Sequence, residues 1–193
     1  MHHTFIKTIK TLAPIPDNQI DKLMALTTQK QIRKGDHFLQ AGTIPEQFGY
    51  NLGGLFRYYY IDQKGNDYTK GFIPENMFVI SYSAMLQHTP SYFSIQALED
   101  SRILVIAYKE WQKLIESNNC WISLTKVLVD RAFIFKEKRE REFLLDDAET
   151  RYRTLLNEFP NLKKRVKQYH IASYLGITPV ALSRIRKKMN LLT

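Results

Sequence analysis

The chain has 193 residues, of which 44% are hydrophobic and 24% charged, close to the average of soluble globular proteins, so disorder over most of its length is not expected. The longest apolar stretch, residues 103–108, is much shorter than a membrane-spanning helix, and no charged segment followed by an apolar core marks a secretory signal. The single cysteine, Cys120, excludes a disulfide framework within the chain and a four-cysteine zinc site. We therefore expect a cytoplasmic protein.

The positive charge is concentrated at the C-terminal end. The net charge is +9, yet residues 1–120 carry 12 basic and 11 acidic side chains, and residues 121–158 carry eight of each. Residues 159–193 contain no acid and these eight basic side chains: Lys163, Lys164, Arg165, Lys167, Arg184, Arg186, Lys187 and Lys188. Such segregation is typical of a polyanion-binding segment, because each neutralised phosphate releases condensed counterions. A basic, solvated tail is the alternative interpretation.

The N-terminal two thirds combine a helical start with a strand-rich body. The first thirty or so residues have helical spacing of apolar side chains, with Asp17 after Pro16 as the expected helix cap. Short strand patterns separated by turn residues follow, at residues 32–42, 55–61, 68–73, 93–97 and 102–108. The second and third of these surround a Gly/Asn/Asp turn and predict a hairpin. Many short strands with regular turns favour a compact barrel or roll.

The order of these patterns resembles the cyclic-nucleotide-binding β-roll and, more specifically, the Crp/Fnr family of transcription regulators. The resemblance rests on Lys-Gly-Asp at 34–36, Gly42, Gly53-Gly54 before the hairpin, and the segment LVIAYKEWQKLI at 104–115. It implies an α+β fold in which residues 1–118 form a sensor domain, a double-stranded, jelly-roll-like β-roll. The glycines serve tight turns, since glycine tolerates a positive φ.

The signature for cyclic nucleotides is missing from the roll. Nucleotide-binding members of this family present a Gly-Glu pair to the ribose and, further on, an Arg-Ser or Arg-Thr pair to the cyclic phosphate. Residues 80–81 (Ile-Ser) and 91–92 (Ser-Tyr) align with these pairs, and no arginine lies between Arg57 and Arg102. A buried phosphate would lack a cationic partner, so we predict that cAMP and cGMP do not bind in the usual way.

The same segment is the candidate effector pocket, formed by Ser81, Tyr82, Ser83, Ser91 and Tyr92. Two hypotheses stay open: an unidentified small molecule occupies this pocket, or side chains such as Tyr82, Met85 and Phe93 fill it.

The residue types give little support for a sensor that uses an iron–sulfur cluster, another metal site or haem. The iron–sulfur members of the family need several N-terminal cysteines, and none precedes Cys120. The histidines do not form the pattern of a β-barrel metal dioxygenase, and we predict no metal site and no cofactor. Haem ligation by His37 or His88 is an open alternative.

A long helical pattern runs from Trp121 to about Phe159, and residues 119–145 are expected to form a dimerisation and linker helix. Apolar and long side chains recur at spacings of three and four, typical of a coiled-coil pairing face: Trp121, Leu124, Leu128, Arg131, Phe135 and Lys138. In the resembling family this helix is the dimer axis. A helix buried within one chain is the alternative. Residues 144–149 are expected to be a hinge, with Asp146 or Asp147 capping the next helix.

The segment 168–189 (QYHIASYLGITPVALSRIRKKM) has the pattern of a helix-turn-helix within a DNA-binding domain of residues 146–193. Gly176 is a helix C-terminal signal, Thr178 is a good N-cap, and Pro179 suits the first helical position. Leu182 begins the inward stripe of the second helix, and its basic residues face outward. A helical hairpin with a basic surface is the alternative. Because the chain stops at Thr193, we expect little or no β-hairpin wing.

The predicted DNA contacts divide by the chemistry of their side chains. Arg184 matches an arginine common in the recognition helix of the family and suits a guanine or a phosphate, while Pro179 and Val180 stand where the family often has Arg-Glu. The whole predicted set is Tyr169, His170, Thr178, Pro179, Val180, Ser183, Arg184, Arg186, Lys187 and Lys188.

The sequence thus predicts a homodimeric, sequence-specific transcription regulator that binds a palindromic site on double-stranded DNA and is not an enzyme. RNA polymerase and an unidentified small-molecule effector are further candidate partners, and no membrane is expected among them. A small-molecule-binding module without DNA function is the alternative. A β-barrel enzyme lacks clustered ligands and a visible nucleophile–base pair.

Overall fold

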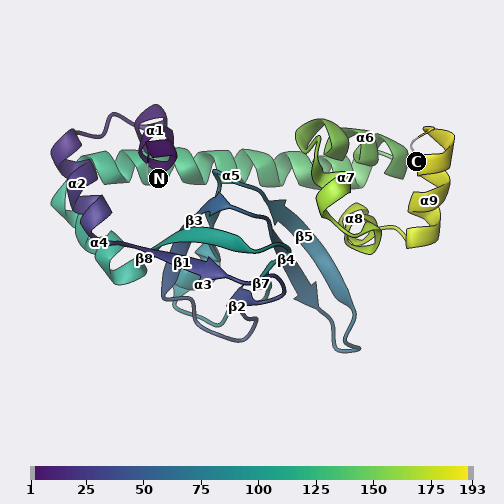
Figure 1. Cartoon of the computed structure of the whole chain (residues 1–193), viewed down its shortest axis with the longest axis horizontal. Coiled ribbons are helices and arrows are strands. Elements are labelled where there is room, and N and C mark those ends of the chain that lie inside the picture. The colour runs from purple at the N-terminus through teal and green to yellow at the C-terminus, as the bar shows by residue number, and fades with distance from the viewer. Residues whose placement is uncertain (1–2, 191–193) are drawn as a thin grey trace. The chain divides into compact units, whose positions relative to one another are not determined.

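The structure is a computed structural model that describes residues 3–190. The helices are α1 (His3–Leu12), α2 (Asp17–Ala25), α3 (Tyr82–Gln87), α4 (Tyr108–Ser117), α5 (Asn119–Leu145), α6 (Ala148–Glu158), α7 (Leu162–Arg165), α8 (Gln168–Leu175) and α9 (Pro179–Lys188) (Figure 1). The strands are β1 (Thr27–Ile32), β2 (His37–Leu39), β3 (Gln47–Gly53), β4 (Phe56–Ile61), β5 (Asp67–Ile73), β6 (Phe78–Val79), β7 (Ser94–Ala97) and β8 (Ser101–Ala107). The α+β class and the long helix are confirmed.

The described chain forms two compact units. The first, the sensor unit, consists of residues 3–58 and 72–133, and the second, the C-terminal unit, consists of residues 59–71 and 134–190. Helix α5 contributes its first part to the sensor unit and its last part to the C-terminal unit.

The sensor unit is built on two four-stranded sheets. One has the strand order β1-β8-β3-β6 and the other β2-β7-β4-β5, and β8 pairs antiparallel with both β1 and β3. Residues of both sheets share one buried cluster, which includes Phe56, Ile95 and Ile103 and therefore lies between the sheets. This arrangement agrees with the expected β-roll.

Strand β8 is buried on both of its faces because successive side chains of a strand point in opposite directions. Ile103 and Val105 enter the cluster between the sheets, whereas Leu104 and Ile106 enter a second cluster that packs against helices. This explains why the sequence of β8 is continuously apolar rather than alternating.

The helix-side cluster joins α1, α2, α4 and the start of α5 to the outer face of the first sheet. Trp121 and Leu124 of α5 are fully buried there, and the indole Nε1 of Trp121 donates a hydrogen bond to Gln19 Oε1 at 3.3 Å. The rings of Trp111 and Trp121 meet edge to face, with centroids 5.5 Å apart. Two members of the predicted pairing stripe, Trp121 and Leu124, therefore pack inside their own chain, where they complete this core.

Two predicted helix caps differ in outcome. Asp17 is wrong as a cap: it is the first residue of α2, and Pro16 occupies the cap position, where no side chain makes a capping bond. The break after α5 is confirmed, and Asp147 caps α6 by accepting a hydrogen bond from Thr150 N at 2.7 Å. None of the helices within residues 3–190 has the length and apolarity that crossing a bilayer requires.

The close packing of β3 against β8 leaves no room for a side chain at Gly49, which can be tested by substitution. A Cβ atom there would lie 2.3 Å from Ile103 Cδ1 and 3.0 Å from Leu104 O, so Gly49→Ala should destabilise the protein by about 1–3 kcal/mol. Thermal unfolding should show a Tm lower by roughly 2–10 °C. Gly71→Ala is the control, because no atom lies within 4 Å of the added methyl group. Equal Tm values for the two variants would contradict this packing.

Candidate nucleic-acid interface

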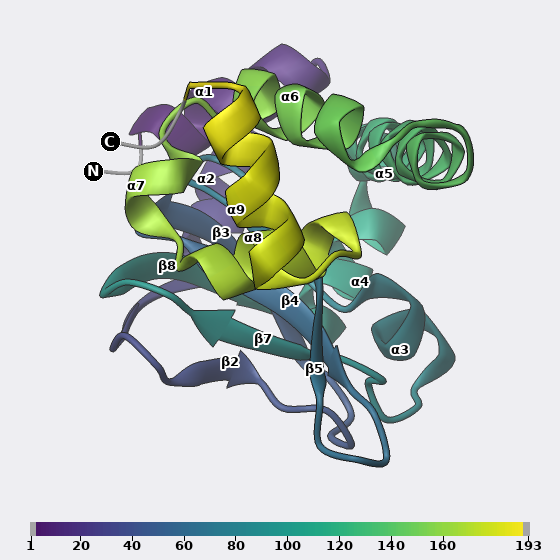
Figure 2. The ribbon, with the colours of Figure 1, turned by 90° about the vertical axis from the view of Figure 1, so that its right-hand side faces the viewer.

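Helices α8 and α9 are joined by a tight turn that follows local backbone chemistry, and we call this pair of helices with its turn the α8–α9 motif. Gly176 ends α8 in the left-handed conformation (φ 70°), which glycine adopts without steric cost. Thr178 Oγ1 then accepts a hydrogen bond from Ala181 N at 3.2 Å and caps α9, with Pro179 as its first residue. Figure 2 shows α9 crossing α8 at this turn.

The inner side of the motif is a small apolar core. Leu182 of α9 is fully buried, as are Ala172 and Leu175 of α8, while Tyr152 and Leu155 of α6 supply the third wall. The predicted inward position of Leu182 is confirmed.

Two arginines bind the carbonyl end of α8. Arg139 of α5 donates a hydrogen bond to the carbonyl of Tyr174, and its guanidinium carbon lies 3.7 Å from the centre of the Tyr174 ring. Arg151 Nη2 of α6 donates to the carbonyl of Leu175 at 3.0 Å. The last carbonyls of a helix have no partner within the helix and carry partial negative charge, so cations are the groups that stabilise them.

An aromatic ring fills the space between these arginines. Phe143 lies with its ring centre 5.4 Å from the Arg139 guanidinium carbon and 4.8 Å from that of Arg151. A Cβ atom on Gly176 would be 2.5 Å from Phe143 Cζ, so this ring packs directly on the turn. We call Arg139, Phe143 and Arg151 the anchor cluster, which fixes the end of α5 and the start of α6 to the turn of the motif.

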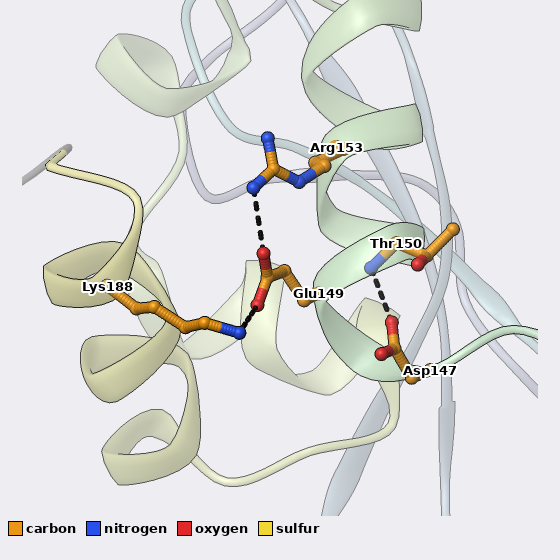
Figure 3. A network of polar contacts seen from close by, with 5 residues as sticks. All are labelled: Asp147, Glu149, Thr150, Arg153 and Lys188. Atoms are coloured by element: carbon orange, nitrogen blue, oxygen red, sulfur yellow. Dashed lines mark hydrogen bonds and ion pairs between the residues drawn. The ribbon is translucent and has the colours of Figure 1, made fainter.

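An ion-pair network joins α9 back to α6 (Figure 3). Glu149 accepts a hydrogen bond from Lys188 Nζ at 2.7 Å and another from Arg153 Nη2 at 2.7 Å. Both bonds lower the pKa of the Glu149 carboxyl, and the bond to Glu149 raises the pKa of Lys188. The two cations are exposed, with 57% of the Arg153 and 75% of the Lys188 side-chain surface accessible, although Glu149 keeps only 20%. The network therefore restricts where Lys188 points more than it adds stability.

The outward side of α9 is a continuous stripe at spacings of three and four residues. Val180, Ser183, Arg184 and Lys187 are all exposed, and Val180 retains 61% of its accessible surface. We call these four residues the exposed stripe. It contains two cations, one hydroxyl, one apolar group and no acid, which suits the edge of a nucleic acid groove.

The remaining predicted contacts are placed differently. His170 is buried, with 5% of its surface exposed, so its side chain belongs to the interior of the motif and its place among the predicted DNA contacts is corrected. Arg186 is half-buried, and its charge acts on the Tyr152 phenol of the core, whose pKa burial raises. Lys188 is held by Glu149. Arg186 follows the buried Leu182 at i+4 on the inner side of α9, whereas Lys188 is exposed and its long side chain reaches Glu149 of α6.

Near the N-terminal end of α8 lie basic groups that the predicted set of DNA contacts does not include. Tyr169 is exposed, as expected, and Lys167 Nζ lies 5.8 Å from the centre of its ring. Lys163 and Lys164 of α7 are exposed as well. The absence of acidic residues from this part of the sequence indicated that these lysines could contact DNA. That absence alone could not distinguish a DNA-contacting surface from an ordinary solvated one.

From Ala148 to Asn190 the described chain contains helices and connecting turns and no strand. The expectation of little or no wing concerns the residues beyond α9, and residues 191–193 lie outside the described part.

The candidate effector segment does not come together as a pocket of five residues. Ser81 and Ser91 are buried and their hydroxyl oxygens are 2.9 Å apart, whereas Tyr82 and Ser83 point to solvent and Tyr92 is 86% exposed. Helical geometry in α3 and the turn before β7 separate these side chains. Tyr82 therefore does not fill the interior, in contrast to Met85, which is buried.

The two serines close a hydrogen-bond chain. Ser91 Oγ donates to the carbonyl of Phe93 at 2.8 Å, so in the contact between the two hydroxyls it accepts from Ser81. Beside them the ring of Tyr58 stacks on Phe93 with centroids 5.1 Å apart, and its hydroxyl accepts a hydrogen bond from Ile80 N at 2.7 Å. Burial raises the pKa of Tyr58, which keeps the phenol neutral.

The described segment 80–93 offers hydroxyl groups but contains no lysine or arginine that could pair with an anion. The alternation of β4 places Phe56 and Tyr58 in the cluster between the sheets and turns Arg57 to the opposite face. Among residues 3–190, no group of three or more His, Cys, Asp or Glu side chains could hold a metal ion.

Comparisons with known proteins agree with this architecture. Residues 29–118 match the cyclic nucleotide-binding domain family. No curated protein matches the chain in sequence.

Solved structures of similar fold extend over nearly the whole chain. The c-di-GMP-responsive global regulator CLP from Xanthomonas campestris has a TM-score of 0.70 and 14% identity, over 91% of this chain and 92% of that one. FixK2 from Bradyrhizobium japonicum has a TM-score of 0.70 and 17% identity, over 85% and 84%. A protein from Eubacterium rectale assigned to the Crp/Fnr regulators has a TM-score of 0.72 and 13% identity, over 92% and 84%. Residues 29–118 thus resemble a cyclic nucleotide-binding domain, and the chain shares its overall fold with these regulators.

The segment around Ser81 and Ser91 has no lysine or arginine to pair with a cyclic phosphate, and this predicts how the protein responds to nucleotides. A ligand present at 100 times its dissociation constant would stabilise the folded protein by about 2.7 kcal/mol. We expect cAMP and cGMP at about 1 mM to leave the Tm of this protein unchanged, with a cAMP-binding regulator of the same fold as the positive control. A rise of several degrees with either nucleotide would contradict the argument from Ser81 and Ser91.

Proposed function

We propose that this chain is a sequence-specific DNA-binding regulator of transcription that binds its site as a homodimer. The observation that carries the proposal is the exposed stripe on α9, which the anchor cluster and the capped turn leave facing solvent. In a helix-turn-helix the second helix enters the major groove and its N-terminal residues contact base edges. The absence of acids from residues 159–193 favours the approach of a polyanion.

Within the exposed stripe we assign different roles to the two cations. Arg184 lies in the middle of α9 and has the planar donor fork that pairs with guanine O6 and N7. Lys187, one turn further along, is a point charge suited to a phosphate, as are Lys163, Lys164 and Lys167. Lys188 and Arg186 contribute less, because α6 engages both of them.

The homodimer is inferred from a second stripe, on the first part of α5. Ile122, Val129 and Phe133 are exposed at spacings of seven and four residues, which is the repeat of a coiled-coil seam. Phe133 leaves 62% of its surface accessible, which is costly for so large an apolar side chain unless a partner covers it. A second copy of the same helix has the matching repeat and covers the stripe by two-fold symmetry.

We infer that regulation does not use cAMP in the usual way. CLP, which has the same fold, is described as responding to c-di-GMP, so this fold serves more than one effector. The hydrogen-bonded pair Ser81–Ser91 replaces charged phosphate recognition in this chain, and neither residue identifies an effector.

Selection of bound sequences from a random duplex library tests the proposed function. The purified protein without added ligand should recover an inverted repeat whose half-sites are about 34 Å apart, since two copies related by a two-fold axis present α9 to successive major grooves. Recovery of no enriched sequence, together with binding no tighter than that of an acidic control protein, would favour a small-molecule module without DNA function.

The selected site then tests the assignment of Arg184. Arg184→Ala should weaken binding to the selected site by about 1–3 kcal/mol and binding to a scrambled duplex by much less, because it removes a base contact. Lys187→Ala is the matched control on the same helix face and should weaken both duplexes alike. Equal losses on both duplexes for Arg184→Ala would assign this side chain to phosphate instead.

A further inference from the structure

Val180 is an exposed apolar side chain in a position where base contacts are made. It is the second residue of α9, it is 61% exposed, and Ser183 and Arg184 follow it at i+3 and i+4 on the same face. A single exposed valine elsewhere on a surface needs no partner. At the N-terminal turn of the second helix of this motif, it lies where the major groove floor is approached most closely.

Val180 is the side chain in the first turn of α9 that we expect to determine base preference, because its neighbours offer little selectivity. Thr178 Oγ1 is engaged in the cap with Ala181 N, and Pro179 has neither a side-chain polar group nor a backbone N–H. Ser183 offers a hydroxyl that can donate to or accept from several bases and therefore discriminates weakly. Selectivity at the N-terminal end of α9 must then come largely from the valine.

The major groove presents one apolar group, the C5 methyl of thymine. The other base edges present donors and acceptors, and covering them with a valine would leave these polar groups without hydrogen-bond partners. Contact with Val180 is therefore favourable at a thymine and unfavourable elsewhere. The distance along the helix axis from residue 180 to residue 184 is about 6 Å, close to two base-pair steps.

We propose that Val180 contacts the C5 methyl group of a thymine in each half-site, within about two base pairs of the guanine that Arg184 contacts. This inference rests on the proposed function and deepens it, because it names a base preference of the same surface. An acidic residue at position 180 would instead accept a hydrogen bond from cytosine N4 and would favour a cytosine at this place in the site.

The experiment replaces thymine by deoxyuridine, which lacks only the methyl group, one position at a time in the selected half-site. At one position near the guanine, the wild-type protein should bind about fourfold more weakly, the effect of removing one buried methyl-sized group. Val180→Ala should bind thymine and deoxyuridine duplexes at that position equally. Val180→Thr, which keeps one methyl group, should retain part of the discrimination.

Ser183→Ala is the matched control on the same exposed face and should keep the full fourfold effect. If the wild-type protein binds the selected site and no deoxyuridine substitution weakens it, the inference fails while the proposed function stands. The same holds if Val180→Ala keeps the fourfold effect. If no sequence is selected at all, the proposed function itself fails, and the two failures are thereby distinguished.

Discussion

The constraint on which the interface depends is the neutralisation of the carbonyl end of α8 by Arg139 and Arg151. Arg139 belongs to α5 and Arg151 to α6. Their hydrogen bonds are accepted by the carbonyls of Tyr174 and Leu175, the two residues of α8 that precede the turn of the motif. A helix terminus buried without such partners would be destabilising, since its carbonyls have lost water. The ring of Phe143 packs directly on this turn, where a Cβ atom on Gly176 would lie 2.5 Å from Phe143 Cζ.

With the turn fixed in this way, the capped start of α9 determines which side chains remain available to a partner. Leu182 faces the core, Arg186 and Lys188 face α6, and the exposed stripe is the part of α9 that remains. The end of α5, which precedes α6, thus helps to position the exposed stripe and does more than connect the two helices. Helix α5 contributes residues to both compact units, and its last part carries Arg139 and Phe143 of the anchor cluster.

Local chemistry made much of this predictable from the sequence. Gly176, Thr178 and Pro179 specify a turn and a cap through backbone preferences alone, and the continuous apolar run of β8 specifies a strand buried on both faces. The roles of Arg139 and Phe143 were not predictable, because the charged run of residues 136–142 is typical of a solvated helix and nothing local shows that α8 ends beside it. His170 was misplaced for the same reason: its burial depends on tertiary packing.

Protection of the exposed stripe by DNA tests the central claim most directly, and the chain is suited to it because Cys120 is its one cysteine. In a Cys120→Ser background, Val180→Cys, Ser183→Cys and Lys187→Cys would each be alkylated with and without the selected duplex. Bound DNA should slow alkylation at all three positions by at least about tenfold and leave Asn157→Cys, exposed on α6, unaffected. Unchanged alkylation at the three positions while the complex is fully formed would contradict the account.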